Sequence, residues 1–298
     1  MAVIDVVVVS YNSRSGLRGC VRTLASRPDV SVVVVDNASA DASLEAIRDL
    51  SVTAIPLDTN HGFGAGCNVG WRSGSAPYVL FLNPDARIDP ESAFRLVRTL
   101  EEHRAAAAAA PRIEDERGGL DYSLRRFPRL RSTYAQALFL HRLFPTQGWT
   151  DEVVRNVSFY EEPGSPEWVS GACILVRRDA IEEIDGFDER FFLYCEDKDL
   201  CRRLRDAGYD IRYEPEAVAR HAGGASAPRA ELLPVLARSR VLYAQKHGGR
   251  GVAPLERLGV ALKSLTHVVV ASGGLRPRRG HARSFATALG RIGTRAGT

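Results

Sequence analysis

Tyr78-Val79-Leu80-Phe81-Leu82-Asn83-Pro84-Asp85 is a run of five apolar or aromatic residues that ends in a polar turn. Such a run is typical of a strand buried on both faces of a sheet. Pro84 has no N–H to donate to a ladder and biases Asn83 toward an extended backbone, so we expect the strand to end there. Asp85 would then lie just beyond the carboxyl end of a central strand, where open α/β sheets bind ligands.

The position of Asp85 allows two interpretations. A carboxylate at this edge can hold a hard divalent cation, and the cation can hold a diphosphate. Alternatively, Asn83 and Asp85 only shape a turn, since Asn-Pro-Asp is an ordinary turn composition. The rest of the chain has to decide between a ligand site and a turn.

The chain before this strand alternates strands with helices. Strands are predicted over three segments rich in β-branched residues: Val3–Val9, Val30–Val35 and Val52–Leu57. Helices are predicted between them, over Leu17–Leu24 and over the segment that carries Leu44, Ile47 and Leu50. This alternation is typical of βαβ units and predicts an α/β fold with a mostly parallel central sheet flanked by helices.

A glycine-rich segment, residues 60–70, follows the third predicted strand. Its spacing, Gly62-x-Gly64-x-Gly66, is not that of the dinucleotide fingerprint, which would also follow the first strand. A Rossmann dehydrogenase is therefore disfavoured. The better interpretation is a loop entering a helix that packs closely on the sheet, with Gly66 and Gly70 allowing the approach of another backbone.

The elements predicted after Asp85 are less regular. A helix is expected over Glu91–His103, and Ala105–Ala110 either extends it or forms a short strand, which we favour. Residues 112–166 are predicted to be a long loop with a helix in it, a type of segment that often carries specificity. Strands are expected over Trp168–Val176 and Ile211–Tyr213, and helices from Leu232 onward.

A helix is predicted from Glu196 to Ala207, closed by Gly208. Asp197 shares one face of this helix with the apolar residues at i+3, i+4 and i+7, namely Leu200, Cys201 and Leu204. The helix dipole explains an acid in the first turn, but it does not explain an acid that points along the buried face. The sequence therefore predicts that Asp197 lies on the buried face of the helix, in its first turn.

The charge of the chain is unevenly placed. The formal net charge of the 298 residues is +4, yet residues 246–298 carry ten Lys or Arg against one acid, Glu256. A basic tail indicates an anionic partner such as a phospholipid surface, a lipid diphosphate or nucleic acid. For residues 260–270, both an ordinary helix on the catalytic domain and an amphipathic membrane surface stay open.

The cysteines and the ends of the chain bear on location. Five scattered cysteines with no Cys-x-x-Cys are typical of reduced core thiols in a cytosolic protein and disfavour a zinc site. No signal peptide is recognised, and no apolar stretch reaches the ~20 residues of a transmembrane helix. We expect a cytoplasmic protein, with peripheral contact at the inner face of the cell membrane left open.

Seven motifs in order resemble family 2 glycosyltransferases of the GT-A fold, and most closely the rhamnosyltransferase branch, which includes galactofuranosyltransferases. The resemblance covers roughly residues 3–222 and implies a catalytic domain over 1–225 with a helical, basic extension over 226–298. The motifs are Val8-Val9-Ser10-Tyr11-Asn12, Val35-Asp36-Asn37-Ala38-Ser39-Ala40-Asp41, Asn60-His61-Gly62-Phe63-Gly64, Leu82-Asn83-Pro84-Asp85, Gly186-Phe187-Asp188-Glu189, Tyr194-Cys195-Glu196-Asp197-Lys198-Asp199-Leu200 and His221.

The resemblance implies a nucleotide-sugar donor, a divalent cation (Mg²⁺ or Mn²⁺) and inversion at the anomeric carbon. Asp85, as the last acid of an Asp-x-Asp motif whose first position is here Asn83, and His221 would hold the metal. Asp197 would be the general base, and Glu196 would help to position the acceptor or the base. The implied donor-binding residues are Ser10, Tyr11, Asn12, Asp36, Asn37, Asn60, Gly62, Asn68, Asn83 and Asp85; those implied to flank the sugar or acceptor are Trp168, Ser170 and Gly171.

The function expected from the resemblance is transfer of one sugar, with rhamnose from dTDP-rhamnose as the first candidate, to a glycan or lipid-linked acceptor in cell-surface polysaccharide assembly. The alternatives are a galactofuranosyl or other UDP-sugar transferase, and a non-catalytic nucleotide-binding scaffold of a glycan assembly complex. No nucleic acid partner is expected. The sequence leaves the oligomeric state open.

Overall fold

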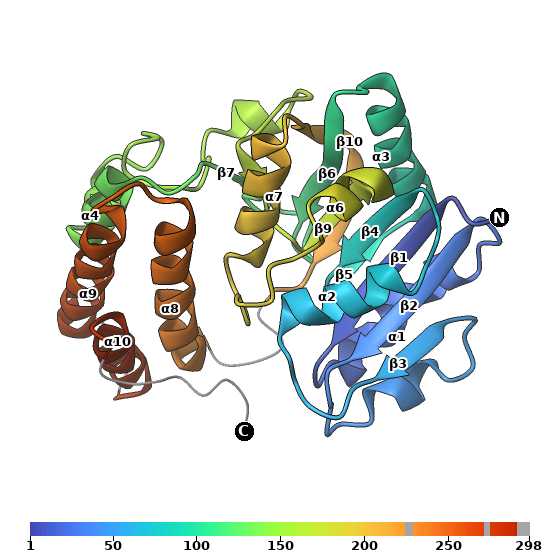
Figure 1. Cartoon of the computed structure of the whole chain (residues 1–298), viewed down its shortest axis with the longest axis horizontal. Helices are drawn as coiled ribbons and strands as arrows, with labels where there is room; N and C mark the ends of the chain where they lie inside the picture. The colour runs from blue at the N-terminus through green and yellow to red at the C-terminus, as the bar shows by residue number, and fades with distance from the viewer. Residues whose placement is uncertain (224–228, 271–274, 291–298) are drawn as a thin grey trace.

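A central sheet of eight strands organises the computed structural model, which describes residues 1–223, 229–270 and 275–290. Helices cover both faces of this sheet (Figure 1). The spatial order of the strands is β3 (Thr53–Pro56), β2 (Val30–Asp36), β1 (Ile4–Ser10), β4 (Tyr78–Leu82), β9 (Cys173–Arg177), β6 (Ala106–Glu114), β10 (Asp210–His221) and β5 (Ala86–Ile88).

Most strands of the sheet run in one direction. β1 pairs in parallel with β2 and β4, β2 with β3, and β6 with β10. Only β9 and β5 run against the others in this sheet. The predicted α/β fold with a mostly parallel sheet is confirmed, and β4 occupies the central position with the predicted bounds.

Side chains of β4 alternate between two hydrophobic cores. Leu80 and Leu82 pack with α1 (Arg14–Ala25) and α3 (Pro90–Glu102) on one face of the sheet. Val79 and Phe81 pack on the other face with α2 (Phe63–Arg72), α6 (Arg178–Glu183) and α7 (Glu196–Asp206). All four side chains are fully buried, each stabilising the fold by about 1.5–3 kcal/mol.

Two local predictions need comment. The predicted helix around Ile47 is a single 3₁₀ turn, η1 (Ser43–Ile47), because Ala42 before it has a left-handed backbone and Asp41 binds the Ser43 hydroxyl instead of capping a longer helix. Five of the six alanines, Ala106 to Ala110, form the start of β6 rather than extending α3, as favoured, and Ala105 lies in the turn before the strand. The small side chains of these five strand residues lie between the two helical layers and are fully or almost fully buried.

The predicted single strand over Trp168–Val176 is wrong, because the segment divides between two sheets. β8 (Trp168–Val169) pairs with β7 (Leu124–Arg125) in a small second sheet, and the chain enters the main sheet only at Cys173. The break spans Ser170–Ala172 and allows the chain to change sheets. It also places Gly171 against the start of α7.

The segment predicted as a long loop with a helix, residues 112–166, contains two short helices and a 3₁₀ turn. These are α4 (Leu130–Ala137), α5 (Leu140–Leu143) and η2 (Val157–Tyr160). Tyr160 is fully buried, and its hydroxyl bonds to the backbone of Leu124 and Val154. The segment is therefore anchored to the domain by a buried tyrosine.

The helical C-terminal extension is confirmed as α8 (Arg229–His247), α9 (Val252–Val270) and α10 (Leu275–Ala288). These helices pack on one another and on α4, and α7 lies between them and the sheet (Figure 1). Lys263, a cation of the basic tail, contributes to this packing. Its amine donates to Gln136 Oε1 at 2.6 Å, and burial lowers the pKa of Lys263 to about 8. The division at residue 225 stays a prediction.

The cysteines and the lengths of the helices complete the description. All five thiols are buried and free of disulfides, as expected for core residues. Burial raises the pKa of each thiol above its ordinary value, which keeps the thiols protonated. Over the described ranges, none of the helices has the length and apolar character needed to cross a membrane.

Candidate active site

Asp85 and His221 meet at the carboxyl edge of the sheet. Asp85 follows the turn that ends β4, and β10 brings His221 opposite Ala86 of β5. His221 Nε2 lies 3.2 Å from Asp85 Oδ1, and both side chains are mostly buried, with 16% and 15% exposed. The amide nitrogen of Asn83 is 3.4 Å from the same ring nitrogen. The two predicted metal ligands and the predicted donor residue Asn83 are therefore brought together.

The imidazole of His221 also has a second acidic neighbour. Asp121 Oδ2 lies 3.9 Å from His221 Nδ1. Burial lowers the pKa of His221, but hydrogen bonds to Asp121 and Asp85 outweigh burial and raise the pKa to about 9. The pKa of Asp121 is lowered chiefly by its hydrogen bond to His221. Sequence reasoning did not single out Asp121, which lies in the irregular segment after β6.

Asp85 and His221 supply only some of the ligands that a divalent cation needs. Over the ranges that the structure describes, no three His, Cys, Asp or Glu side chains form a metal-binding group. Asp85 and His221 thus offer one carboxylate and one imidazole. Mg²⁺ and Mn²⁺ sites commonly combine so few protein ligands with substrate phosphates and water. The residues fit a cation completed by a diphosphate, and do not fit a closed structural site.

Loops from three strand ends surround the predicted nucleoside site and bind one another. Asp36 is buried at the end of β2 and accepts hydrogen bonds from both the amide and the hydroxyl of Ser39. Asn37 donates to Gly62 O at 2.9 Å, joining the β2 loop to the glycine-rich segment. Asn60 Oδ1 accepts from Gly62 N at 2.9 Å. These predicted donor residues therefore fix the shape of the loops at this edge.

The remaining predicted donor residues differ in exposure. Asn12 Oδ1 accepts from Ala40 N at 2.8 Å, while Tyr11 beside it is exposed. Ser10 is fully buried, and its hydroxyl has no hydrogen-bond partner among the described residues. A ligand at this edge can reach Tyr11 directly but Ser10 only if the loop moves. Donor binding by these residues stays a prediction.

Asn68 has a packing role that the sequence did not indicate. It is buried in α2, and its amide oxygen accepts from Trp71 Nε1 and Phe187 N, at 3.0 and 2.8 Å. Its amide nitrogen donates to Phe187 O and to Glu189 Oε1, both at 2.9 Å. All its hydrogen-bonding positions are thus used to hold the turn at Phe187 on α2. A contact between Asn68 and the nucleotide stays a prediction.

The start of α7 is shaped by an unusual backbone. Tyr194 and Cys195 both have positive φ, 67° and 68°, a conformation that costs energy in residues with side chains. The turn directs Glu196 and Asp197 into the first helical turn. Asp197 Oδ2 accepts from Gly171 N at 3.0 Å, and a Cβ at Gly171 would lie 3.0 Å from Asp197 Cβ. Gly171, predicted to flank the acceptor, thus contacts the predicted base.

The predicted burial of Asp197 needs correction. Asp197 is only partly buried, whereas Glu196 and Lys198 on either side of it are buried, with 6% and 5% exposed. The apolar face of the helix does not by itself predict which residues are buried, because α7 is covered both by the sheet and by α8. Polar residues outside the apolar face are therefore buried as well. A partly exposed Asp197 is accessible to an acceptor.

Glu196 is the buried acid of this pair. Burial, and then the charge of Asp197, raise the pKa of Glu196 well above its ordinary value. Its Oε2 atom has no hydrogen-bond partner within the described part of the chain. The side chain lies next to Gly64, the position at which α2 begins its approach to the sheet. A buried acid with a raised pKa beside a partly exposed carboxylate is typical of functional sites.

The other two residues predicted to flank the sugar or acceptor make structural contacts. Trp168 is buried, donates from Nε1 to Arg126 O at 2.9 Å, and lies 5.1 Å below the amine of Lys198. Ser170 donates from its backbone to Ser123 O at 3.0 Å. Both residues hold the β7–β8 sheet beside α7, and a sugar contact from them stays a prediction.

This geometry agrees with comparisons of sequence and structure. The sequence profile described as "Glycosyl transferase family 2" matches residues 5–184, more than half of the chain. The chain belongs to glycosyl transferase family 2. It is 33% identical to the N-acetylglucosaminyl-diphospho-decaprenol L-rhamnosyltransferase of Mycobacterium tuberculosis, over 93% of this chain and 96% of that protein. It is 32% identical to rhamnosyltransferase WbbL of Escherichia coli, over 54% of this chain and 61% of WbbL.

Solved structures support the GT-A fold of this family 2 member. A mannosyltransferase from Pyrobaculum calidifontis, in complex with GDP-Man and Mn²⁺, aligns over 97% of this chain and 86% of its own, with a TM-score of 0.58 and 15% identity. Staphylococcus aureus TarS residues 1–349 with UDP align over 97% and 89%, with a TM-score of 0.53 and 17% identity. At such identities the likeness shows the fold.

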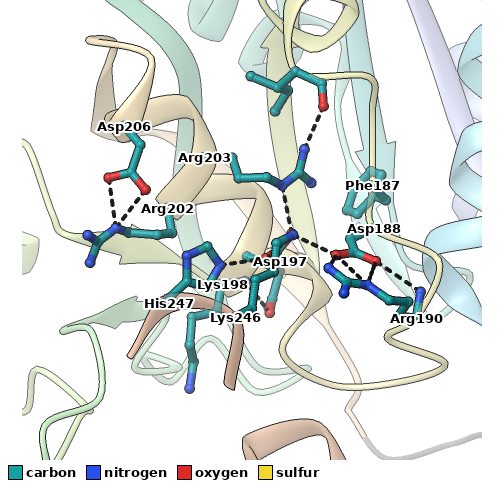
Figure 2. A network of polar contacts seen from close by, with 12 residues as sticks. Phe187, Asp188, Arg190, Asp197, Lys198, Arg202, Arg203, Asp206, Lys246 and His247 are labelled. Atoms are coloured by element: carbon teal, nitrogen blue, oxygen red, sulfur yellow. Dashed lines mark hydrogen bonds and ion pairs between the residues drawn. The ribbon is translucent and has the colours of Figure 1, made fainter. Parts of the chain in front are cut away.

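Two cations beside the candidate site were not singled out from the sequence either. Lys246 and His247, at the end of α8, reach the first turn of α7 and bind Asp199. Figure 2 shows both side chains next to α7, together with Asp188 and Arg190 from the preceding loop. No periodic signal marks these residues, because cations at a helix end are ordinarily exposed.

Proposed function

We propose that the protein is an inverting, metal-dependent rhamnosyltransferase that transfers rhamnose from dTDP-rhamnose to a lipid-linked sugar during cell-surface polysaccharide assembly. The observation that carries the proposal is the placement of three groups at one edge of the sheet: the Asp85–His221 pair, the loops at Asp36 and Asn60, and the partly exposed Asp197. The rhamnosyltransferases among the relatives favour rhamnose as the sugar.

The donor would lie along the carboxyl edge of the sheet. The loops held by Asp36 and Asn37 would bind the nucleoside, and Asp85 and His221 would hold Mg²⁺ or Mn²⁺ beside the diphosphate. The cation supplies positive charge that stabilises the leaving nucleoside diphosphate. The partial burial of Asp85 and His221 strengthens their electrostatic interaction with such a ligand, because water screens it less.

Asp197 would act as the general base. The acceptor oxygen attacks the anomeric carbon, the proton of the hydroxyl passes to the Asp197 carboxylate, and the nucleoside diphosphate leaves with the bonding electrons of the broken C–O bond. Attack from the side opposite the leaving group inverts the anomeric carbon. The Gly171 amide holds one carboxylate oxygen of Asp197. Burial raises the pKa of Glu196, and the protonated side chain would donate a hydrogen bond to the acceptor or to Asp197.

The acceptor is proposed to be an N-acetylglucosaminyl diphosphate carried on a polyprenol, as the name of the mycobacterial relative states for that protein. Contact with a membrane surface would present such an acceptor. Apolar side chains are exposed near α5 and along α9: Leu138, Leu143, Phe144, Trp149, Leu265, Val269 and Val270. Phe139 stacks on His267 of α9 at 4.5 Å, which brings the two groups into one region. We propose this region as the membrane contact.

The transfer reaction can be tested with purified protein, a panel of dTDP- and UDP-sugars, Mn²⁺ and a short-chain N-acetylglucosaminyl-diphospho-polyprenol. The expected result is transfer of rhamnose from dTDP-rhamnose, loss of turnover in EDTA, and an inverted anomeric centre by NMR. Asp197→Asn should lose transfer but keep donor affinity, whereas Asp206→Asn, an exposed acid on the same helix, should behave as wild type. Metal-independent turnover, or normal turnover by Asp197→Asn, would contradict the mechanism.

The membrane contact has its own test. The double variant Leu143→Glu and Val269→Glu should sediment less with anionic vesicles than wild type, because it replaces two of the most exposed apolar side chains with like charges. Turnover with a water-soluble acceptor should be unchanged. Equal sedimentation of the variant and the wild type would remove this surface from the proposal.

A further inference from the structure

A cavity of about 540 Å³ opens on the α1 side of the Asp85–His221 pair. Its walls come from the first turn of α1, from β5 and from the end of β10. The nucleoside loops at Asp36 and Asn60 do not line it. Asn12, a predicted donor-binding residue, lines the cavity together with Asp85 and His221, so the cavity belongs to the candidate donor site. The roles described so far leave Arg87 and Arg220 in its wall without a function.

Two arginines on neighbouring strands lie in the wall of this cavity. Arg87 of β5 and Arg220 of β10 are direct partners in the antiparallel register, so their side chains leave the sheet on the same face. Like charges at directly opposed positions destabilise a sheet. Both side chains are exposed, and among the described residues neither guanidinium has an ion-pair or hydrogen-bond partner. The two guanidinium groups therefore repel each other, and a bound anion would reduce this repulsion.

The neighbouring helix leaves room for these side chains. A Cβ at Gly19 would lie 2.9 Å from Arg87 Nε, so the absence of a side chain there allows the Arg87 guanidinium to lie across α1. A Cβ at Gly16 would lie 2.9 Å from Pro84 O, so Gly16 lets the first turn of α1 approach the turn before Asp85. Ser15, which precedes Gly16 in the first turn of α1, also lines the cavity.

The acids of the cavity do not neutralise the two arginines. Asp85 is engaged by His221, and Glu116, which also lines the cavity, is exposed and forms no ion pair with either guanidinium. Guanidinium groups bind phosphate oxygens through two parallel hydrogen bonds. A phosphoryl group between Arg87 and Arg220 would therefore satisfy both cations at once.

We propose that Arg87 and Arg220 form a subsite for a phosphoryl group, next to the candidate metal pair. The phosphoryl group belongs to a diphosphate ligand, either the nucleotide-sugar donor or the lipid-linked acceptor. This assignment of sources rests on the proposed transfer reaction. The existence of the subsite is independent of that reaction, because an anion can bind there without turnover.

Binding of inorganic pyrophosphate in EDTA, measured by calorimetry on the full chain, tests the subsite itself. Wild type should bind, and Arg87→Gln and Arg220→Gln should each weaken binding about 10-fold or more, as loss of a charge-assisted hydrogen bond implies. Arg22→Gln removes an exposed arginine of α1 outside the cavity and should bind as wild type. Without ligand, the two cavity variants should melt no lower than wild type, because each removes a repulsion.

Steady-state kinetics then identify the source of the phosphate. A higher KM for dTDP-rhamnose in both cavity variants assigns the subsite to the donor, and a higher KM for the polyprenyl diphosphate acceptor assigns it to the acceptor. Unchanged pyrophosphate affinity in both variants, or binding weakened equally by Arg22→Gln, overturns the subsite. If wild type binds pyrophosphate through these arginines but transfers no sugar, the transfer proposal fails and the subsite stands.

Discussion

Lys246 Nζ, at the end of α8, lies 2.7 Å from Asp199 Oδ1 in the first turn of α7. His247 Nε2 lies 2.7 Å from the same oxygen, and Arg203 holds the other oxygen at 2.7 Å. Burial raises the pKa of Asp199, but its bonds to His247, Arg203 and Lys246 outweigh burial and lower the pKa. The C-terminal extension is thus tied to the helical turn that carries Asp197, as Figure 2 shows.

Lys246→Met is expected to lower kcat about 10-fold and to leave the KM for the donor almost unchanged, because it loosens the turn that holds Asp197 and not the nucleoside loops. Lys246→Arg should restore most of the activity, since it keeps the charge opposite Asp199. Arg250→Gln, an exposed cation just beyond α8, is the matched control. Wild-type kcat for Lys246→Met in steady-state assays would show that α8 does not position α7.

Glu152 stabilises the fold through two buried cations. It lies 2.8 Å from Lys198 and 2.7 Å from Arg240. Burial raises the pKa of Glu152, but the charges of Arg240 and Lys198 outweigh burial and lower the pKa from 4.5 to about 2. A lowered carboxyl pKa contributes stability that is present above pH 4.5 and is lost as the pH falls through about 2. The shift corresponds to roughly 3 kcal/mol at neutral pH.

Glu152→Gln should therefore lower the free energy of unfolding by about 3 kcal/mol or more at pH ~7, since it leaves two buried cations without their carboxylate. The difference in the free energy of unfolding between the variant and wild type should become smaller as the pH is lowered toward about 3. Urea unfolding at both pH values measures the effect. Glu161 is an exposed acid of the same segment, and Glu161→Gln should change the free energy of unfolding by no more than ~0.5 kcal/mol at either pH. A pH-independent loss would contradict the electrostatic origin.

Glu196 should show the opposite dependence on pH. Its pKa is raised in the folded protein, so the folded state binds more protons than the unfolded state, and stability falls as the pH rises above the ordinary value of 4.5. Glu196→Gln removes this cost. We expect the variant to melt higher than wild type at pH ~8 and equally at pH ~4, with reduced kcat. Glu162 is an exposed acid, and Glu162→Gln should leave the melting temperature unchanged at both pH values. A lower melting temperature at pH ~8 would contradict the assignment.

The strand-end residues of the site could be predicted because their chemistry is local. Asp85 follows an apolar run and a proline, which together mark the end of a central strand. His221 was placed only by resemblance, because β10 was predicted to end near Tyr213. The strand continues to His221 past Pro215 because a register shift between Glu214 and Val218 absorbs the proline as a bulge. A sequence pattern alone does not reveal such a bulge.

The buried ion pairs could not be predicted, because each joins distant segments. Lys198 belongs to the helix that starts at Glu196, and its partner Glu152 belongs to a segment predicted to be a long loop with a helix. For the same reason Asp197 is less buried than predicted, and the burial of Glu196 was not predicted. Helical periodicity identifies the face toward one neighbour, but α7 has neighbours on both sides. Only the packing of α8 on α7 determines which of the acids is buried.

Gly171→Ala tests the contact that orients Asp197. A Cβ at position 171 would lie 3.0 Å from Asp197 Cβ, so the loop or the carboxylate must shift by a few tenths of an ångström. We expect kcat to fall about 10-fold or more, with donor KM and melting temperature nearly unchanged, because small displacements of a catalytic group are costly. Gly164→Ala is the matched control, since nothing lies within 4 Å of its added Cβ. Equal kcat for both variants and wild type would show that the Gly171 contact does not position the base.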